Sequence, residues 1–230
     1  TYNRWMYIPP AYEINDWEEI TRFVAEARAG EFVTVTRAGV AEATTLPFTW
    51  YPKFSGGGLE VKDYGRVTTH MAKTNPQWRE IEDGAPALII VHSPGAYISP
   101  ANYAKTYETG KAVGTWDYQV VHLRGTVEVV HGHDEIMSIV SDLQRDHEAS
   151  RSQPWDLASA DQDFLHEMIK HVVGFTVQVS SVEAKYKLDQ KESKSDRSKI
   201  VNDLLNSDRP GDKHIAKEMQ RLFLSLIHIS

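Results

Sequence analysis

The sequence predicts an α+β fold in which mostly antiparallel strands form a barrel and helices lie at its periphery. Five to seven segments of the 230-residue chain read as strands, whereas helical periodicity appears near the two ends and in one inserted pair. Because strands and helices do not alternate regularly, a doubly wound parallel sheet is disfavoured. The length suits one large domain or two small ones.

The N-terminal half begins with a helix and continues as strands. In "NDWEEITRFVAEARAG", Asp16 is placed to cap a helix that Gly30 ends. The apolar stripe of this helix consists of Ile20, Phe23, Val24 and Ala27. Beyond it, strands are expected at 31–37, 41–51 and 82–92, with a turn at Ala38-Gly39 and a loop at the triple glycine 56–58.

The C-terminal half adds two strands and four helices. A long strand at 118–132, with Gly125 marking a bend or bulge, is followed by helices at 133–149 and 159–174 and a strand at 175–188. After a polar loop, helices are expected at about 196–206 and 212–227. We therefore expect a domain over residues 1–190 with inserted helices at 133–170, and a helical tail over 191–230.

Composition excludes several classes of function. With no cysteine, the chain has no disulfide, iron–sulfur cluster, thiolate zinc site or thiol nucleophile. No apolar run approaches the roughly 20 residues that span a bilayer, and the N-terminus lacks a signal-peptide pattern, so a cytoplasmic protein is expected. The net charge of -7 disfavours broad contact with nucleic acid and leaves only local DNA contact open.

Two short segments are candidates for binding a phosphorylated heterocycle. Neither glycine-loop phosphate motif is present, so side-chain cations and hydroxyls would have to hold a phosphate. "THMAKTNPQW" (69–78) offers Lys73 beside threonines, and "ATTLPF" (43–48) offers two adjacent hydroxyls. The alternatives are a solvated lysine on a polar surface and an ordinary edge strand.

Other candidate groups are less specific. Loop aromatics at Tyr97, Tyr103, Trp116 and Tyr118 fit either a ligand pocket or peripheral packing. His131, His133 and His147 lack the spacing of metal ligands, so no metal site is predicted. No nucleophile motif identifies a catalytic residue.

Taken jointly, six strings resemble one known family, the PaiB-like FMN-binding split-barrel proteins, which are often called negative transcriptional regulators. In order they are "MYIPPAYEI", "ATTLPF", "HMAKTNPQW", "AYISPANY", "TWDYQVVHLRG" and "VVGFTVQVSSVEAKYKLDQ". The resemblance runs from about residue 6 to about 206. It implies a split β-barrel related to pyridoxamine phosphate oxidase, acting as a homodimer with FMN near the subunit interface.

The resemblance also implies a set of flavin contacts. Lys73 would neutralise the phosphate, helped by His70 and Asn75, with Thr69 in the same segment. Thr44, Thr45 and Leu46 would lie along the isoalloxazine edge and the ribityl chain. Trp116 and Gln190 would reach the flavin from the partner subunit.

The chain departs from the family pattern in several places. Thr69 replaces a glycine, and Lys73 stands where arginine is frequent, which keeps the charge but loses the bidentate geometry. Asp189 replaces a serine of the usual "KLSQN", and "VGTWDY" replaces "VPTWNY", which introduces Asp117. The last residues, 222–230, match no part of the pattern.

Three functions follow from the resemblance. The chain is expected to be a flavin-dependent transcriptional regulator or redox protein. An FMN-dependent oxidoreductase acting on a small organic substrate is the first alternative. A haem-binding or haem-degrading protein, with His70 or another histidine as axial ligand, is the second.

Overall fold

The computed structural model describes residues 5–53 and 63–225, so the predicted loop at 56–58 and residues 226–230 lie outside the described residues. Contacts divide the chain into two compact units. Residues 16–91 and 121–183 form the first, here called the barrel unit, and residues 1–15, 92–120 and 184–230 form the second, the helical unit. The helical tail is thus grouped with residues 92–120, whereas the sequence predicts a boundary near residue 190.

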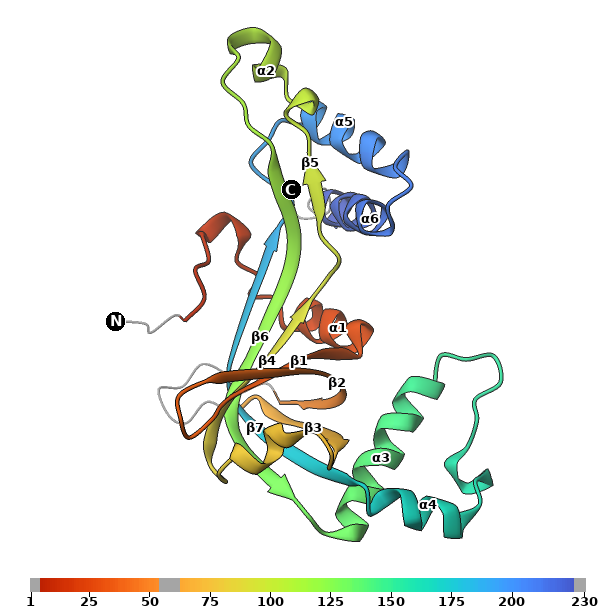
Figure 1. Ribbon diagram of the computed structural model, residues 1–230. Coiled ribbons are helices and arrows are strands. Elements are labelled where there is room, and N and C mark those ends of the chain that lie inside the picture. The colour runs from red at the N-terminus through yellow and green to blue at the C-terminus, as the bar shows by residue number, and fades with distance from the viewer. Residues whose placement is uncertain (1–4, 54–62, 226–230) are drawn as a thin grey trace. The chain divides into compact units, whose positions relative to one another are not determined.

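A curved antiparallel sheet forms the barrel unit (Figure 1). Its strands are β1 (Ala29–Val35), β2 (Ala41–Pro52), β3 (Gly65–Ala72), β4 (Ala85–His92), β6 (Thr115–Val130) and β7 (Val172–Lys187). The order along the sheet is β4-β1-β2-β3-β7-β6, and an additional pairing of β4 with β6 closes it. The α+β barrel predicted from the sequence is confirmed.

The barrel interior is filled by apolar side chains from alternate positions of the strands. Phe32 and Phe175 place their rings 5.2 Å apart, and both side chains are fully buried. The other fully buried apolar residues of the strands include Val67, Val91, Val121, Leu123, Val127, Val173 and Val177. Burial of this apolar area is the main favourable term in folding of the unit.

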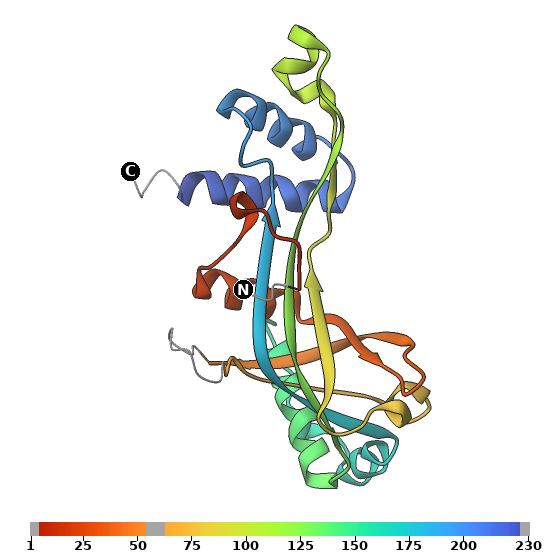
Figure 2. The ribbon, with the colours of Figure 1, turned by 90° about the vertical axis from the view of Figure 1, so that its left-hand side faces the viewer.

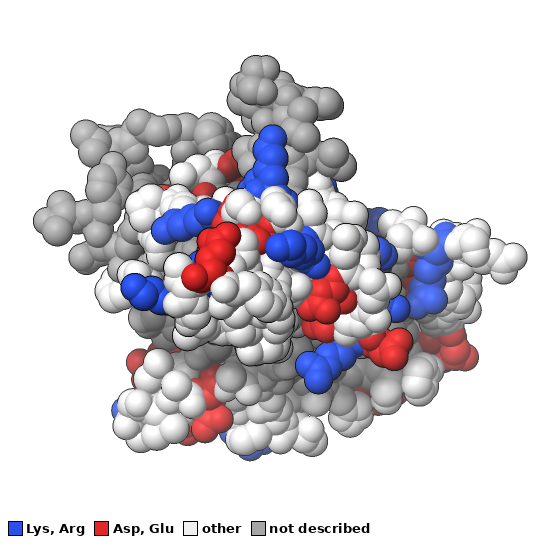
Figure 3. Space-filling model, turned by 90° about the horizontal axis from the view of Figure 1, so that it is seen from above, with Lys and Arg blue, Asp and Glu red and all other residues white. Residues whose placement is uncertain are grey.

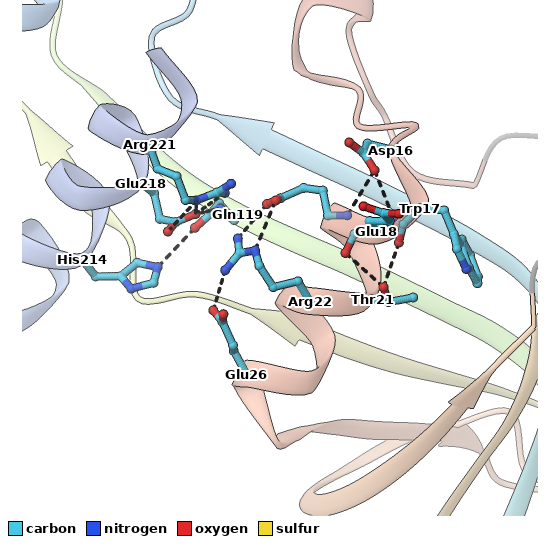
Figure 4. Close-up of polar contacts among 11 residues, drawn as sticks. Asp16, Trp17, Glu18, Thr21, Arg22, Glu26, Gln119, His214, Glu218 and Arg221 are labelled. Carbon is cyan, nitrogen blue, oxygen red and sulfur yellow. Dashed lines mark hydrogen bonds and ion pairs between the residues drawn. The ribbon is translucent and has the colours of Figure 1, made fainter. Parts of the chain in front are cut away.

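Helices α1 (Trp17–Ala27), α3 (His133–Glu148) and α4 (Gln162–Ile169) belong to the barrel unit. Asp16 caps α1 as predicted, because its carboxylate accepts hydrogen bonds from the backbone N–H groups of Glu18 and Glu19 (Figure 4). The predicted stop at Gly30 is wrong. The helix ends at Arg28, which adopts a left-handed conformation with φ of 60°, and Gly30 is already part of β1.

The helical unit is built around short strand pairing and two packed helices. Strand β5 (Ala96–Ile98) pairs with the first residues of β6, from Thr115 to Asp117. Helices α5 (Lys194–Leu205) and α6 (Pro210–Ser225) lie side by side (Figure 2). Their buried side chains include Ile200, Leu204, Ile215 and Met219. Within residues 5–53 and 63–225, no helix is both long and apolar enough to cross a bilayer.

The structure departs from the sequence prediction where local signals compete. The helix predicted at 159–174 ends at Ile169, because β-branched Val172 and Val173 pair with β3 instead. Strand β5 and helix α2 (Ala104–Thr109) are not predicted, since each is too short to show a periodicity. The bend expected at Gly125 coincides with a close approach of β6 and β7.

Gly125 permits this approach, and its replacement by alanine is expected to destabilise the fold. An added Cβ would lie 1.9 Å from the carbonyl oxygen of Gln178, which belongs to the rigid β7 backbone. We expect Gly125→Ala to lower the free energy of unfolding by about 3 kcal/mol, the upper part of the usual range for overpacking. Urea denaturation measures this loss.

Gly132→Ala is the matched control. Its added Cβ would meet the flexible carboxylate of Glu135, so we expect a loss below about 1 kcal/mol, mainly from replacing glycine at a helix N-cap. If the two variants lost the same free energy of unfolding, Gly125 would not be required for the close approach of β6 and β7.

Candidate functional site

Antiparallel pairing of β2 with β3 brings the two candidate segments together. Phe48 of β2 is opposite Thr69 of β3, so the preceding part of β2 runs beside the end of β3 and the turn that follows it. Asn75 donates from its side-chain amide to the hydroxyl of Thr44 at 3.0 Å, which ties this turn to β2. The seven residues Thr44, Thr45, Leu46, Thr69, His70, Lys73 and Asn75 are here called the β2–β3 site.

A buried glutamine, Gln77, organises this site. Its amide nitrogen donates to the carbonyl oxygen of Phe32, to the hydroxyl of Thr34 and to the carbonyl oxygen of Glu42, at 3.0 to 3.3 Å. Its amide oxygen accepts from the hydroxyl of Thr44 at 2.6 Å. Sequence reasoning missed Gln77 because a glutamine after "NP" is typical of an exposed turn. Only the unusual burial of its side chain identifies it.

Lys73 is positioned by its own backbone. Its N–H donates to the carbonyl oxygen of His171 at 2.8 Å, and its carbonyl oxygen accepts from the indole of Trp78 at 3.0 Å. The ammonium group donates to the carbonyl oxygen of Lys170, just after the end of α4, at 2.7 Å. An ammonium group has three N–H donors, and within the described part of the chain this is its one hydrogen bond, so two remain for a ligand. A cation at a helix C-terminus also complements the helix dipole.

His70 presents an unusual imidazole. Its Nδ1 is buried and has no hydrogen-bond partner among the described residues. Burial lowers the pKa of His70, so the ring is neutral at physiological pH. A neutral imidazole can still donate or accept one hydrogen bond at the orphaned nitrogen, and leaving it unpaired is costly.

The remaining residues of the β2–β3 site differ in accessibility. Thr69 is buried, and its hydroxyl donates to the carbonyl oxygen of Pro47 at 2.7 Å within the sheet. Leu46 is buried, whereas Thr45 is exposed. Thr45 and the Lys73 ammonium are therefore the most accessible donors, and Thr69 acts within the protein.

Trp116 and Gln190 belong to the helical unit. Trp116 is 54% exposed and lies opposite Tyr97 across the β5–β6 pair. The side chain of Gln190 accepts from the N–H of Leu188 at 2.9 Å and donates to the carbonyl oxygen of Tyr186 at 2.6 Å. Trp116 is thus free to meet a ligand, while Gln190 is occupied at the end of β7.

Two buried carboxylates lie beside these residues in the sequence and share one lysine. Lys187 donates to Asp117 at 2.8 Å, to the hydroxyl of Thr115 and to the carbonyl oxygen of Trp116. Asp117 is fully buried, and its second oxygen has no partner among the described residues. Burial, together with the charge of Asp189, raises the pKa of Asp117 from 3.8 to about 7, although Lys187 opposes the shift.

Asp189 is the second carboxylate of this cluster. It adopts a left-handed conformation with φ of 51° and accepts a hydrogen bond from the hydroxyl of Tyr103 at 2.7 Å. Burial raises the pKa of Asp189. Burial also raises the pKa of Tyr103, and the hydrogen bond to Asp189 and the charge of that residue add to this shift. Asp117 and Asp189 therefore belong to one buried network in which each carboxyl group holds its proton more tightly than usual.

Histidines form a contact that spacing did not reveal. His133 and His166, far apart in sequence, stack with ring centroids 4.9 Å apart and ring nitrogens at 3.0 Å. Asp134 is beside His133 at 3.1 Å. Even so, no group of three histidine, aspartate or glutamate side chains in the described part of the chain is arranged to hold a metal ion.

Comparison with known families decides the relationship. Residues 6–181 match the family model described as "Putative FMN-binding domain". The chain belongs to this FMN-binding family. The match confirms the resemblance seen in the sequence and the expectation of FMN as the cofactor of the family.

Individual relatives of this FMN-binding family member extend the picture. The chain is 33% identical over 217 residues to "Protease synthase and sporulation protein PAI 2" of Bacillus subtilis (strain 168), covering 94% of this chain and 97% of the relative. Among solved structures, it is similar to the FAD and haem binding protein from Mycobacterium smegmatis, with TM-score 0.51, 14% identity, and coverage of 76% and 73% of the two chains. The flavocytochrome Anf3 from Azotobacter vinelandii gives TM-score 0.50, 12% identity and coverage of 76% and 69%. These likenesses support the split-barrel fold.

The residues of the β2–β3 site fit the needs of FMN. A flavin requires donors and a cation for its phosphate and hydrogen bonds for its ring edge. This family member offers two unused N–H groups on Lys73, an orphaned nitrogen on His70 and the exposed hydroxyl of Thr45. The donor set therefore matches the cofactor without a glycine-rich loop.

The raised pKa of Asp117 predicts a pH-dependent stability. Between about pH 4 and about pH 7, aspartate is ionised in the unfolded chain but still protonated in the fold, so the free energy of unfolding falls as pH rises. Asp117→Asn removes this linkage. We expect the variant to gain stability relative to the unmodified chain across that interval and to keep a constant difference above it. Thermal melting between pH 4 and pH 8 measures the effect.

Asp134→Asn is the control for this comparison, because the side chain of Asp134 is fully exposed. Its stability difference is expected to change little with pH. A difference for Asp117→Asn that is equally flat between pH 4 and pH 7 would contradict the proton on Asp117.

Proposed function

We propose that the protein binds FMN at the β2–β3 site and acts as a flavin-dependent redox protein. The supporting observation is that two groups able to bind a ligand lie three residues apart in one segment. Among the described residues, the Nδ1 of His70 has no hydrogen-bond partner, and the Lys73 ammonium has two N–H groups left. Lys73 would hold the phosphate, and His70 and Asn75 would add hydrogen bonds. Thr44, Thr45 and Leu46 would line the ring and ribityl chain along β2.

Each of these residues has a defined physical task. Lys73 supplies a charge-assisted contact, which is stronger than a contact between neutral groups. The hydrogen bond from Asn75 to the hydroxyl of Thr44 attaches the turn to β2, and the amide oxygen of Gln77 accepts a hydrogen bond from the same hydroxyl. The bound flavin would supply one- or two-electron chemistry, while the protein orients it and excludes water.

A homodimer completes the proposed site. The exposed indole of Trp116 and the strand end at Gln190 would meet the flavin held by the β2–β3 site of a second copy. An indole exposed to 54% is a suitable stacking surface for a flat ring, and its burial between subunits would stabilise both contacts. The acidic residue next to it, Asp117, would then lie close to the cofactor.

A regulatory role on DNA has less physical support. Basic and acidic side chains are intermingled on the face seen in Figure 3, without a continuous basic patch. In the helical unit, Lys105 is paired with Glu192 at 2.9 Å. With a net charge of -7, recognition of DNA would need a local basic surface. The resemblance to the PaiB-like proteins, which are often called negative transcriptional regulators, keeps a regulatory role as an alternative.

Haem is a second candidate cofactor, favoured by one observation. The neutral, partly buried imidazole of His70 has the protonation state that an axial ligand needs. The printed names of the two structural relatives above also include haem or a flavocytochrome.

An absorbance spectrum of the purified protein separates these cofactors. Bound flavin gives bands in the blue and near-ultraviolet, and haem gives a Soret band. We expect saturable binding of added FMN with flavin bands. A Soret band after addition of haem, with no FMN binding, would replace this proposal with the haem alternative. Consumption of NAD(P)H with an electron acceptor then tests redox activity, and a specific shift of promoter DNA tests regulation.

Loss of the Lys73 charge is expected to weaken FMN binding. Lys73→Ala should cost about 1.5–3 kcal/mol, the range for a hydrogen bond to a charged group, which corresponds to roughly 10- to 150-fold in Kd. Lys73→Gln removes the charge but keeps an N–H donor for the carbonyl oxygen of Lys170, on a shorter side chain. Flavin fluorescence titration measures both variants.

Lys53→Ala is the charge-matched control, since Lys53 is an exposed lysine paired with Asp63 on the surface. Its affinity for FMN should be unchanged. If Lys73→Ala weakened FMN binding but Lys73→Gln did not, the role of Lys73 would be its hydrogen bond to the carbonyl oxygen of Lys170. It would then not bind the phosphate through its charge.

Mixing of variant subunits tests the contribution of Trp116 from a second copy. Lys73→Ala and Trp116→Ala should each weaken both sites of a homodimer. A mixed dimer would carry one site with both defects and one intact site. In a statistical mixture, about a quarter of all sites should therefore recover full affinity. Titration of FMN into refolded one-to-one mixtures measures this fraction.

No recovery in the mixture would place Lys73 and Trp116 in the same subunit's site, or would mean that no dimer forms. Sedimentation of the same samples distinguishes these two results. Either of them contradicts the shared site.

A further inference from the structure

A pocket of about 580 Å³ lies in the barrel unit between α1, β2 and the end of α3. This volume falls within the range of ligand-binding pockets, roughly 300–1,000 Å³. None of the residues of the β2–β3 site lines it. The walls include Val24 and Ala25 from α1, Phe48 and Trp50 from β2, and His147 from α3.

The pocket exists because α1 and α3 both pack on β2, as Figure 1 shows, and are joined at their ends by Arg28. The guanidinium of Arg28 donates to the carbonyl oxygen of His147 at 3.1 Å and to the hydroxyl of Ser150 at 2.9 Å. Arg28 holds this position in a left-handed backbone conformation, which is unfavourable for a residue with a side chain. Its contacts fix the end of α3 and keep the space between the helices open.

The two arginines of the lining, Arg22 and Arg28, and the carboxylate of Asp146 have partners within the protein. Arg22 is paired with Glu19 at 2.7 Å. It is also paired with Glu26 at 2.5 Å (Figure 4). Asp146 accepts from the hydroxyl of Thr49 at 2.9 Å. Glu18, the other acidic residue of the lining, is exposed to solvent. An anionic ligand would therefore compete with the existing contacts of the two arginines, whereas an uncharged ligand would not.

One polar atom of the lining residues lacks a partner. The Nε2 of His147 is buried and makes no hydrogen bond with any residue that the structure describes. Leaving a buried polar atom unpaired is unfavourable, so a ligand group that pairs with it gains specificity. The apolar wall is aromatic: Phe48 is buried, and Trp50 packs edge-on against Trp17 with centroids 5.4 Å apart.

We propose that this pocket is a second small-molecule site, for an uncharged aromatic compound whose single hydroxyl pairs with His147 Nε2. The aromatic ring would lie against Phe48 and Trp50, and the hydroxyl would meet the orphaned nitrogen. This site is separate from the β2–β3 site and does not depend on flavin binding. A phenolic compound is the simplest ligand with the required shape, charge and donor.

Calorimetric titration of the full chain with phenol and with toluene tests the proposal. The two probes share a ring and differ in the hydroxyl. We expect saturable binding of one phenol per chain, at least about tenfold tighter than toluene, the equivalent of 1.4 kcal/mol. His147→Phe should abolish this preference, and Ala25→Leu should weaken both probes by filling the pocket.

His171→Phe is the matched control, because His171 is exposed and does not line the pocket. Lys73→Ala is a second control, since it should leave the affinity for phenol unchanged even if it weakens FMN. Melting curves confirm that each variant is folded. Absence of saturable phenol binding, equal affinity for phenol and toluene, or a preference retained in His147→Phe would overturn the proposal.

Discussion

The attachment of the turn after β3 to β1 and β2, through the buried amide of Gln77, is the constraint on which the candidate flavin site depends. Gln77 joins β1, β2 and the turn after β3 by hydrogen bonds to Phe32, Thr34, Glu42 and Thr44. These bonds act together with the Asn75–Thr44 hydrogen bond to hold the turn that carries Lys73 and Asn75 beside β2. A buried polar network of this kind is costly when incomplete, so it also fixes one arrangement of the three segments.

The structure separates residues that support the site from those that can touch a ligand. Thr69 and Gln77 are buried and bonded within the protein, so they position their neighbours. Lys73, Thr45 and His70 retain unused donors or an unpaired nitrogen. The acidic pair at positions 117 and 189 adds a buried network of titratable groups in the helical unit. Because Asp117 holds a proton up to about pH 7, this network couples protonation to folding.

Much of the fold could be predicted from the sequence, because long elements carry clear periodicity. The helix capped by Asp16 and the long strands β6 and β7 appear close to their expected positions. The stop at Gly30 was misplaced because Arg28 takes the left-handed position through contacts with α3, far away in the chain. Such long-range compensation leaves no trace in local sequence patterns.

The candidate site was predictable only through family resemblance, since side-chain hydroxyls and one lysine are common on any surface. Sequence could not identify Gln77, whose role depends on burial, or the orphaned nitrogens of His70 and His147, which depend on tertiary packing. The histidine pair at 133 and 166 likewise arises from the meeting of two helices. These features are consequences of the fold and not of spacing.

A crystal structure of the chain with FMN tests the central claim most directly. The account predicts a phosphate oxygen within hydrogen-bond distance of the Lys73 ammonium, about 2.7–2.9 Å for a charged pair, with the ring beside β2 near Thr45. A flavin bound elsewhere in the barrel, with Lys73 still directed only to the end of α4, would contradict it.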